Sequence, residues 1–182
     1  MIKNNLAMAI VLGLMSVSAL SQAATTDQGH GQIKFTGSII DAPCSITPDT
    51  ANQNVYLGQI SNLALKDGGK STPVSFQIDL EKCDTTTLKG VTATFTGAAS
   101  VGNPDMLGIT GSAKGASIAI TDGSGTLIKF GEASTKQIIQ DGSNTIAFSA
   151  YLQGDMSSDG TTGAPIVPGE FSSIANYALN YQ

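Results

Sequence analysis

Residues 73–80 read Pro-Val-Ser-Phe-Gln-Ile-Asp-Leu, and every second side chain in this stretch is apolar. Val74, Phe76, Ile78 and Leu80 therefore share one face of an extended chain, because successive side chains of a β-strand point to opposite faces. This period of two predicts a strand with one buried face.

Similar runs recur on both sides of this stretch. They cover residues 33–39, 54–58, 91–95, 116–120, 127–130, 145–152 and 171–181. The sequence Asp122-Gly-Ser-Gly125 separates two of these runs and is typical of a hairpin turn. The polar, glycine-containing residues 97–115 and 154–168 are predicted loops. Short strands at this spacing predict an all-β fold, a single antiparallel β-sandwich.

The composition excludes several classes of function. The 182 residues include no Arg and one His, and nine Lys against 14 Asp and Glu give a net charge of −5. An acidic chain without Arg is a poor partner for nucleic acid, because such binding depends on neutralising phosphates. The lone His30 argues against His-based catalysis and metal sites. Asp79 and Glu81 fall on the polar face of a predicted strand and indicate a solvated face rather than an acid–base pair. We therefore expect no enzymatic activity, no metal and no cofactor.

Residues 1–23 have the pattern of a signal peptide. Lys3 precedes the apolar residues 6–20, and small residues at Ser21 and Ala23 suit cleavage after Ala23. An uncleaved membrane anchor is the alternative, but the apolar run is short and the cleavage signal is good. The predicted mature chain begins at Ala24.

Export changes the interpretation of the two cysteines, Cys44 and Cys83. In an oxidising compartment a lone pair is expected to form a disulfide. Closing a loop of about 40 residues stabilises a fold by roughly 4 kcal/mol in the chain-entropy account. A metal-binding or nucleophilic cysteine is the alternative, and the absence of a nearby His disfavours it.

Both ends of the predicted mature chain alternate between apolar and polar residues. The aligned positions near the start are Ile33, Phe35, Gly37 and Ile39, and those at the end are Phe171, Ser173, Ala175, Tyr177, Leu179 and Tyr181. The end segment could be an ordinary edge strand, and the start segment could pair within its own domain or with another chain. Periodicity alone does not decide between these possibilities, although strand addition to a neighbour can build polymers.

The chain also contains a series of local motifs. They are Phe35-Thr-Gly37-Ser-Ile-Ile-Asp-Ala-Pro-Cys44, residues 74–83, Ile118-Ala-Ile-Thr-Asp122 followed by Leu127-Ile-Lys-Phe-Gly131, Gly169-Glu-Phe171, and the closing Leu179-Asn-Tyr181-Gln182. In this order and spacing, with a leader and one Cys pair, the mature chain resembles the major structural pilins of bacterial chaperone–usher fimbriae, most closely the P-pilus and type 1 rod subunits.

The resemblance implies an incomplete immunoglobulin-like β-sandwich that lacks its last strand. In this family a periplasmic chaperone fills the resulting groove, and the N-terminal segment of the next subunit then replaces the chaperone strand at an outer-membrane usher. The donated residues in this sequence would be Ile33, Phe35, Gly37 and Ile39. The groove and chaperone-binding residues would be Gly169, Phe171, Ala175, Tyr177, Leu179 and Tyr181.

The expected function is therefore that of a structural subunit of an adhesive fimbria on the bacterial surface, with identical or related pilins as partners. Residues 1–23 would be the signal peptide, 24–43 the donor-strand extension and 44–182 the pilin domain. A minor adaptor pilin of the same system is one alternative. A secreted monomeric β-sandwich binding module is another, but it should gather aromatic residues on a binding loop, and this chain has no Trp and four Tyr.

Overall fold

The computed structural model describes residues 29–157 and 160–182. The proposed signal peptide, residues 1–23, lies outside this range. The chain divides into two units, residues 1–39 and residues 40–182. We describe each unit by itself.

In the first unit, the described residues 29–39 have no regular secondary structure and are all exposed. Ile33 is 78% exposed and Phe35 is 88% exposed. The strand expected over residues 33–39 is therefore not formed in the single chain. Its alternating pattern is real, but a strand also needs a neighbour for its backbone N–H and C=O groups.

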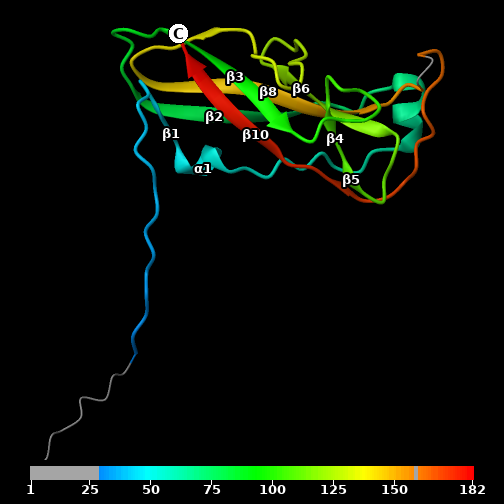
Figure 1. Cartoon of the computed structure of the whole chain (residues 1–182), viewed down its shortest axis with the longest axis horizontal. Coiled ribbons are helices and arrows are strands. Elements are labelled where there is room, and N and C mark those ends of the chain that lie inside the picture. Colours follow the sequence, from blue (N-terminus) through cyan, green and yellow to red (C-terminus); the bar gives the residue numbers. More distant parts are fainter. Residues whose placement is uncertain (1–28, 158–159) are drawn as a thin grey trace, which may run out of the picture. The chain divides into compact units, whose positions relative to one another are not determined.

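The second unit is built on a five-stranded antiparallel sheet (Figure 1). Its strands, in spatial order, are β1 (Ser45–Ile46), β2 (Val74–Cys83), β8 (Gly142–Gly154), β6 (Ala116–Asp122) and β4 (Leu107–Gly108). The predictions for residues 73–80, 116–120 and 145–152 are confirmed, because each run lies almost entirely within one of these strands.

A three-stranded sheet faces the first one. Its strands, in spatial order, are β10 (Ala175–Tyr181), β3 (Gly90–Gly97) and β7 (Gln137–Ile138). A separate two-stranded sheet pairs β5 (Thr110–Gly111) with β9 (Phe171–Ser172). The described helical segments are α1 (Pro48–Ala51) and the 3-10 segment η1 (Asn62–Gly68). The all-β sandwich expected from the sequence is confirmed.

The core lies between the two main sheets. Ile78 and Leu80 of β2 are almost fully buried, and so are Val91 of β3 and Phe148 of β8. Phe95 of β3 crosses the core to meet Phe148 edge to face, with the ring centroids 5.2 Å apart. Such contacts between the sheets bury the apolar faces that the period of two predicts.

Cys44 and Cys83 form a disulfide, as the sequence predicts. Both residues are buried, at 3% and 6% exposure. The bond joins the residue before β1 to the last residue of β2, and the Asp84 amide donates to the Pro43 carbonyl beside it at 2.9 Å. The start of the domain is thus fixed to the end of a central strand.

Other predictions need correction. Residues 54–58 form no strand, and residues 127–130 contribute only a bridge between Leu127 and Thr121. The final run is divided at residues 173–174 into β9 and β10. The predicted loop 97–115 contains β4 and β5. The turn after β6 is present, because the Asp122 side chain accepts hydrogen bonds from the backbone amides of Ser124 and Thr126.

Within the described residues, no helix is long and apolar enough to cross a membrane.

Candidate functional site

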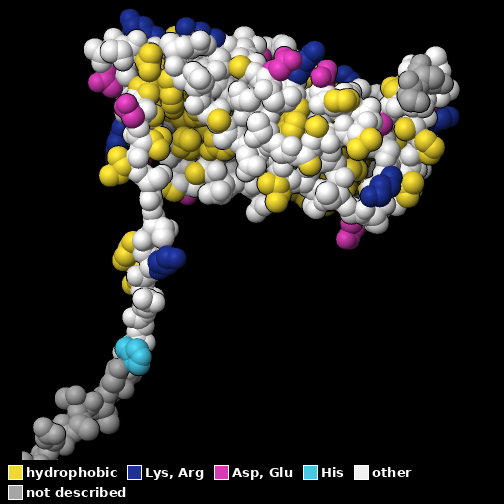
Figure 2. Space-filling view, in the orientation of Figure 1, with side chains coloured by type: hydrophobic (Ala, Val, Ile, Leu, Met, Phe, Trp, Pro, Cys, Tyr) yellow, Lys and Arg dark blue, Asp and Glu magenta, His cyan; other side chains and the backbone are white. Residues whose placement is uncertain are grey.

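An open groove of about 1,490 Å³ runs along the domain beside the C-terminal strand. One side is formed by residues 166–177, which include β9 and the start of β10, and the other by residues 51–62. Figure 2 shows hydrophobic side chains gathered between β10 and α1 in the same view as Figure 1. The groove therefore exposes part of the apolar interior.

The floor of the groove is apolar and comes from both main sheets. Its side chains are those of Phe76, Ile78, Phe95, Leu107, Ile118, Ile120, Ala150 and Leu152. In a complete sandwich such side chains would be covered by a further strand. Leaving apolar surface in contact with water costs about 25 cal/mol per Å².

Strand β10 is one wall of the groove, and its outer edge is open. It pairs with β3 along its whole length, from Ala175 opposite Gly97 to Tyr181 opposite Val91. It lies at the end of its sheet, so it has no strand on its other side among the described residues. A strand edge of this kind presents unpaired backbone groups to any added strand.

The hydrogen bonds at the C-terminus show which residues present these groups. The amide and the carbonyl of Gln182 both pair with Gly90 at 2.9 Å. Antiparallel strands alternate bonded and non-bonded pairs. The even-numbered residues of β10 therefore bond to β3, while Ala175, Tyr177, Leu179 and Tyr181 direct their N–H and C=O groups to the open edge. The last residues are also held in place rather than frayed.

The side chains of the same residues face the interior. Ala175, Tyr177, Leu179 and Tyr181 are half-buried and pack against the core, whereas the residues between them are exposed. Phe171 of β9 shares this inward orientation. The inward face predicted for the C-terminal run is confirmed by the structure.

Gly169 lies at the other end of this wall and is exposed. A Cβ atom added here would lie 2.7 Å from the Ala113 amide nitrogen. Glycine is therefore needed because the backbone of residues 112–113 approaches closely.

The opposite wall, residues 51–62, was not identified from the sequence as part of the site. Residues 53–60 belong to no helix or strand. The Gln53 side chain holds the segment by donating to the carbonyl oxygens of Thr50 and Gln77, both at 2.7 Å. Leu57 and Ile60 pack on the core, and Tyr56 at the rim is 79% exposed. The run predicted as a strand at 54–58, which pairs with no strand among the described residues, was the available signal.

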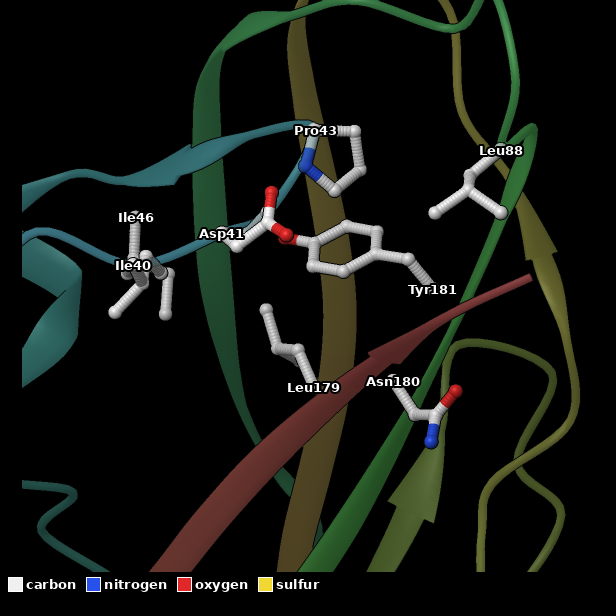
Figure 3. Close-up of a pocket in the computed structure, with 9 residues that line it drawn as sticks. Ile40, Asp41, Pro43, Ile46, Leu88, Leu179, Asn180 and Tyr181 are labelled. Atoms are coloured by element: carbon white, nitrogen blue, oxygen red, sulfur yellow. The ribbon is translucent and has the colours of Figure 1, made fainter.

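A second pocket of about 360 Å³ lies at the C-terminal end of β10. Figure 3 shows the Tyr181 ring directed across it toward Asp41 and Pro43, with Leu179 beside the ring. The rest of its apolar lining comes from Ile40, Ala42, Ile46 and Leu88.

Burial raises the pKa of the Tyr177 hydroxyl above its ordinary value. The pKa of Tyr181 is raised first by burial and then by the nearby Tyr177. The Tyr177 hydroxyl lies 3.5 Å from the carbonyl oxygens of Thr50 and Ala51, on the opposite side of the groove. These two tyrosines of the wall are therefore uncharged at neutral pH.

The predicted donor residues belong to the first unit, residues 1–39. Ile33, Phe35, Gly37 and Ile39 are all exposed, and a Cβ added at Gly37 would have no atom within 4 Å. Their role as a donated strand is untested by the structure of one chain and stays a prediction.

Comparisons with known proteins identify relatives of the chain. Residues 33–182 match the family model described as "Fimbrial protein". The "Fimbria A protein" of Serratia marcescens is 57% identical over 179 residues, which are 98% of each chain. The "Major MR/P fimbria protein" of Proteus mirabilis is 53% identical over 180 residues, again 98% of each chain.

Solved structures give the same picture. A chaperone–usher pilus, solved to explain rod uncoiling, is 32% identical with a TM-score of 0.73, and the match covers 88% of this chain and 100% of that one. The P pilus rod subunit PapA is 31% identical with a TM-score of 0.66, over 78% of this chain and 100% of that one.

Proposed function

Because this chain belongs to the fimbrial protein family, and is a structural subunit of a surface fimbria with an immunoglobulin-like fold, we propose that it polymerises by strand donation. In this proposal residues 33–39 of one subunit fill the groove of the next. Ile33, Phe35, Gly37 and Ile39 enter the groove, and Phe171, Ala175, Tyr177, Leu179 and Tyr181 receive them.

One observation carries the proposal: the same chain has an apolar groove with an open strand edge and, elsewhere, an exposed alternating segment without a strand partner. The groove lacks a strand, and residues 33–39 have the period of a strand with one apolar face. A strand formed by residues 33–39 would cover the apolar floor of the groove, and it would exchange backbone hydrogen bonds with the open edge of β10.

The energetics favour this pairing. Ile33, Phe35 and Ile39 are each at least 78% exposed. Burying a large apolar side chain stabilises by roughly 1.5–3 kcal/mol. The added strand would also satisfy the unpaired N–H and C=O groups of β10.

The donor segment and the groove lie in different parts of the chain, so strand donation between copies would produce a polymer. The donated residues precede Cys44, whereas the groove is built from residues that follow it. Each subunit can then donate at one end and accept at the other, which is a head-to-tail contact that extends indefinitely. We propose that residues 24–43 are the extension and residues 44–182 the pilin domain, as the sequence predicts.

An open groove is a hazard before assembly, because exposed strand edges and apolar surface promote aggregation. We therefore propose that a periplasmic chaperone covers the groove and that an outer-membrane usher receives the subunit. The solved relative described as a chaperone–usher pilus supports this assignment. The family is one of structural pilins, and we propose that this chain acts without catalysis.

The comparisons do not favour the alternatives considered from the sequence. Two of the relatives are named as major fimbrial or major pilin proteins. A monomeric binding module would not need an open strand edge along an apolar groove.

A synthetic peptide of residues 29–42 tests strand donation. Added in excess to the purified mature chain, it should raise the midpoint of thermal unfolding, because a ligand that binds only the folded state stabilises it. A peptide of the same composition in scrambled order is the control. If both peptides leave the midpoint unchanged, residues 33–39 are not the occupant of the groove.

A further inference from the structure

We propose that Met156 is an oxidation site of the folded subunit, where a peroxide or hypochlorous acid converts the thioether to a sulfoxide, and that this change loosens the 3-10 segment η1 from the end of β8. The site lies within the second unit, residues 40–182, and is independent of strand donation. Extracellular oxidants reach a surface fimbria directly, so a reactive side chain on the subunit meets them first.

The two methionines of the predicted mature chain lie in contrasting surroundings. Of the five methionines in the sequence, three fall in the predicted signal peptide, and Met106 and Met156 remain. Met106 is 5% exposed and packs with Ala119, Tyr151 and Leu127. Met156 follows the end of β8 and is 37% exposed. Because an oxidant must reach the sulfur, Met156 should react first.

The Met156 sulfur lies against the turn that ends η1. A Cβ atom added at Gly68, the last residue of η1, would lie 3.0 Å from Sδ and 3.8 Å from Cγ of Met156. Gly68 has a φ of 77°, a conformation that suits glycine. Met156 also forms a β-bridge with Gly163, and a Cβ atom added at Gly163 would lie 2.7 Å from the Asp67 amide nitrogen. The loop after β8 therefore packs closely on this turn, and the thioether is part of that contact.

The turn matters because η1 carries part of the groove. The Gly154 amide of β8 donates to the Gly69 carbonyl at 2.9 Å, and the Leu65 carbonyl leaves no room for a Cβ atom at Gly154. Leu65 is buried in the core and lines the groove, as do residues 51–62. Figure 1 shows η1 as the blue-green coil at the end of the domain away from the C-terminus. A change at Met156 thus acts where the groove wall joins the main sheet.

The oxidation needs nothing from the protein except an accessible sulfur. The sulfur lone pair attacks one oxygen of the peroxide, the O–O bond breaks and an S–O bond forms. The sulfur is oxidised by two electrons, the proton of the transferred oxygen passes to the other oxygen, and that oxygen leaves as water or an alcohol. With hypochlorous acid, chloride and a proton leave instead.

The sulfoxide removes the contact between the loop and η1. It turns a flexible apolar side chain into a polar and chiral one. The sulfur is too close to the Gly68 backbone to carry an oxygen on that side, so the side chain must turn toward water. The packing contacts on η1 are then lost, and we expect η1 to open locally more often.

Peptide mass spectrometry of the mature chain in dilute hydrogen peroxide tests the site. Cleavage after lysine places the two methionines in different peptides, because Lys114, Lys129 and Lys136 lie between them. We expect Met156 to be oxidised severalfold faster than Met106 in the native chain, and at the same rate in urea with the disulfide intact. Equal rates in the native chain, or faster oxidation of Met106, overturn the proposal.

A leucine variant tests the loosening. Met156→Leu keeps an apolar side chain of similar size but has no sulfur to oxidise. Peroxide should lower the midpoint of thermal unfolding of the wild-type chain by a few degrees and leave that of Met156→Leu unchanged. Met106→Leu is the matched control and should stay as sensitive as wild type. Methionine sulfoxide reductases should restore the wild-type midpoint. An equal fall in wild type and Met156→Leu, or no fall in wild type, rejects the loosening.

Hydrogen exchange locates the change. After oxidation, peptides that cover residues 62–69 should exchange their amide hydrogens faster, because the contacts of η1 with the loop are lost. Peptides from β3 and β10 should exchange as before. Faster exchange in β3 and β10 to the same extent would show a general loss of stability and would contradict a local effect at η1.

Discussion

Asp122 is the buried carboxylate on which the turn after β6 depends. Its Oδ1 accepts hydrogen bonds from the amides of Ser124 and Thr126, both at 2.9 Å, and its Oδ2 accepts one from the Thr135 hydroxyl at 2.8 Å. Burial alone would raise the pKa of Asp122, but the hydrogen bonds from Ser124, Thr135 and Thr126 hold it below the ordinary value.

We predict that Asp122→Ala lowers the free energy of unfolding by about 1–3 kcal/mol at pH 7, because the amides of Ser124 and Thr126 and the Thr135 hydroxyl lose a charged acceptor. Urea unfolding measures this loss. Asp105→Ala is the control, because Asp105 forms only an exposed ion pair with Lys129 at 3.5 Å, and such pairs contribute less than about 1 kcal/mol.

The stability lost in Asp122→Ala should become smaller as the pH falls. The pKa of Asp122 is lowered in the folded chain, so its stabilising effect is complete above the unfolded value near 3.8 and is lost as the pH falls through the folded value. The difference between wild type and Asp122→Ala should therefore shrink below about pH 4. An equal difference at pH 7 and at low pH would contradict this account.

Tyr177 and Tyr181 should make the groove wall sensitive to alkali. Their pKa values are raised in the folded chain, so their contribution is complete below the unfolded value near 10 and is lost as the pH rises through the folded values. We predict that unfolding stability falls above pH 10. Tyr177→Phe with Tyr181→Phe should weaken this fall. The same alkaline loss in the double variant would assign it to other groups.

At the scale of elements, the alternation of apolar and polar residues predicts which face of a strand is buried, but it does not predict which strand pairs with it. Residues 74–80, 91–95 and 145–152 became strands because each finds a neighbour within the domain. Residues 33–39 alternate and residues 54–58 were also predicted as a strand, but neither run pairs with a strand among the described residues. Two of the failed strand predictions therefore fall on a groove wall and on its proposed occupant.

The candidate site could be predicted only in part for the same reason. Alternation correctly indicated that Ala175, Tyr177, Leu179 and Tyr181 share an inward face. It could not indicate that residues 51–62 lie across the groove from them, because that proximity comes from the tertiary fold. The break at residues 173–174 was also invisible, since the Ser173 hydroxyl bonds to the distant Gly108 carbonyl at 2.6 Å.

The donor element can be tested through its glycine. We predict that Gly37→Val in the peptide of residues 29–42 abolishes its stabilising effect, because a branched side chain in place of the glycine would overpack the groove. Gly31→Val is the matched control, since Gly31 precedes residues 33–39, the proposed donor segment. If the Gly37→Val peptide stabilises the chain as well as the unchanged one, the narrow part of the groove does not face this residue.

For the whole molecule, assembly depends on keeping donation and acceptance in separate parts of one chain. The groove is lined by residues between Ile46 and Tyr177, and the disulfide at Cys44 fixes the start of the domain without the extension. Removing the extension should therefore abolish donation and leave acceptance intact. The two activities then become separable in one experiment.

We predict that a chain lacking residues 24–41 still binds the peptide of residues 29–42 but forms no fibres alone. Mixed with the wild-type chain, it should shorten fibres in proportion to its fraction, because it can fill one end of a fibre and cannot be followed at the other. Electron microscopy of fibre lengths measures the effect. A chain of full length with residues 33–39 in scrambled order is the control for the deletion and should shorten fibres equally. Long fibres from the truncated chain alone would show that some other segment carries the contact between subunits.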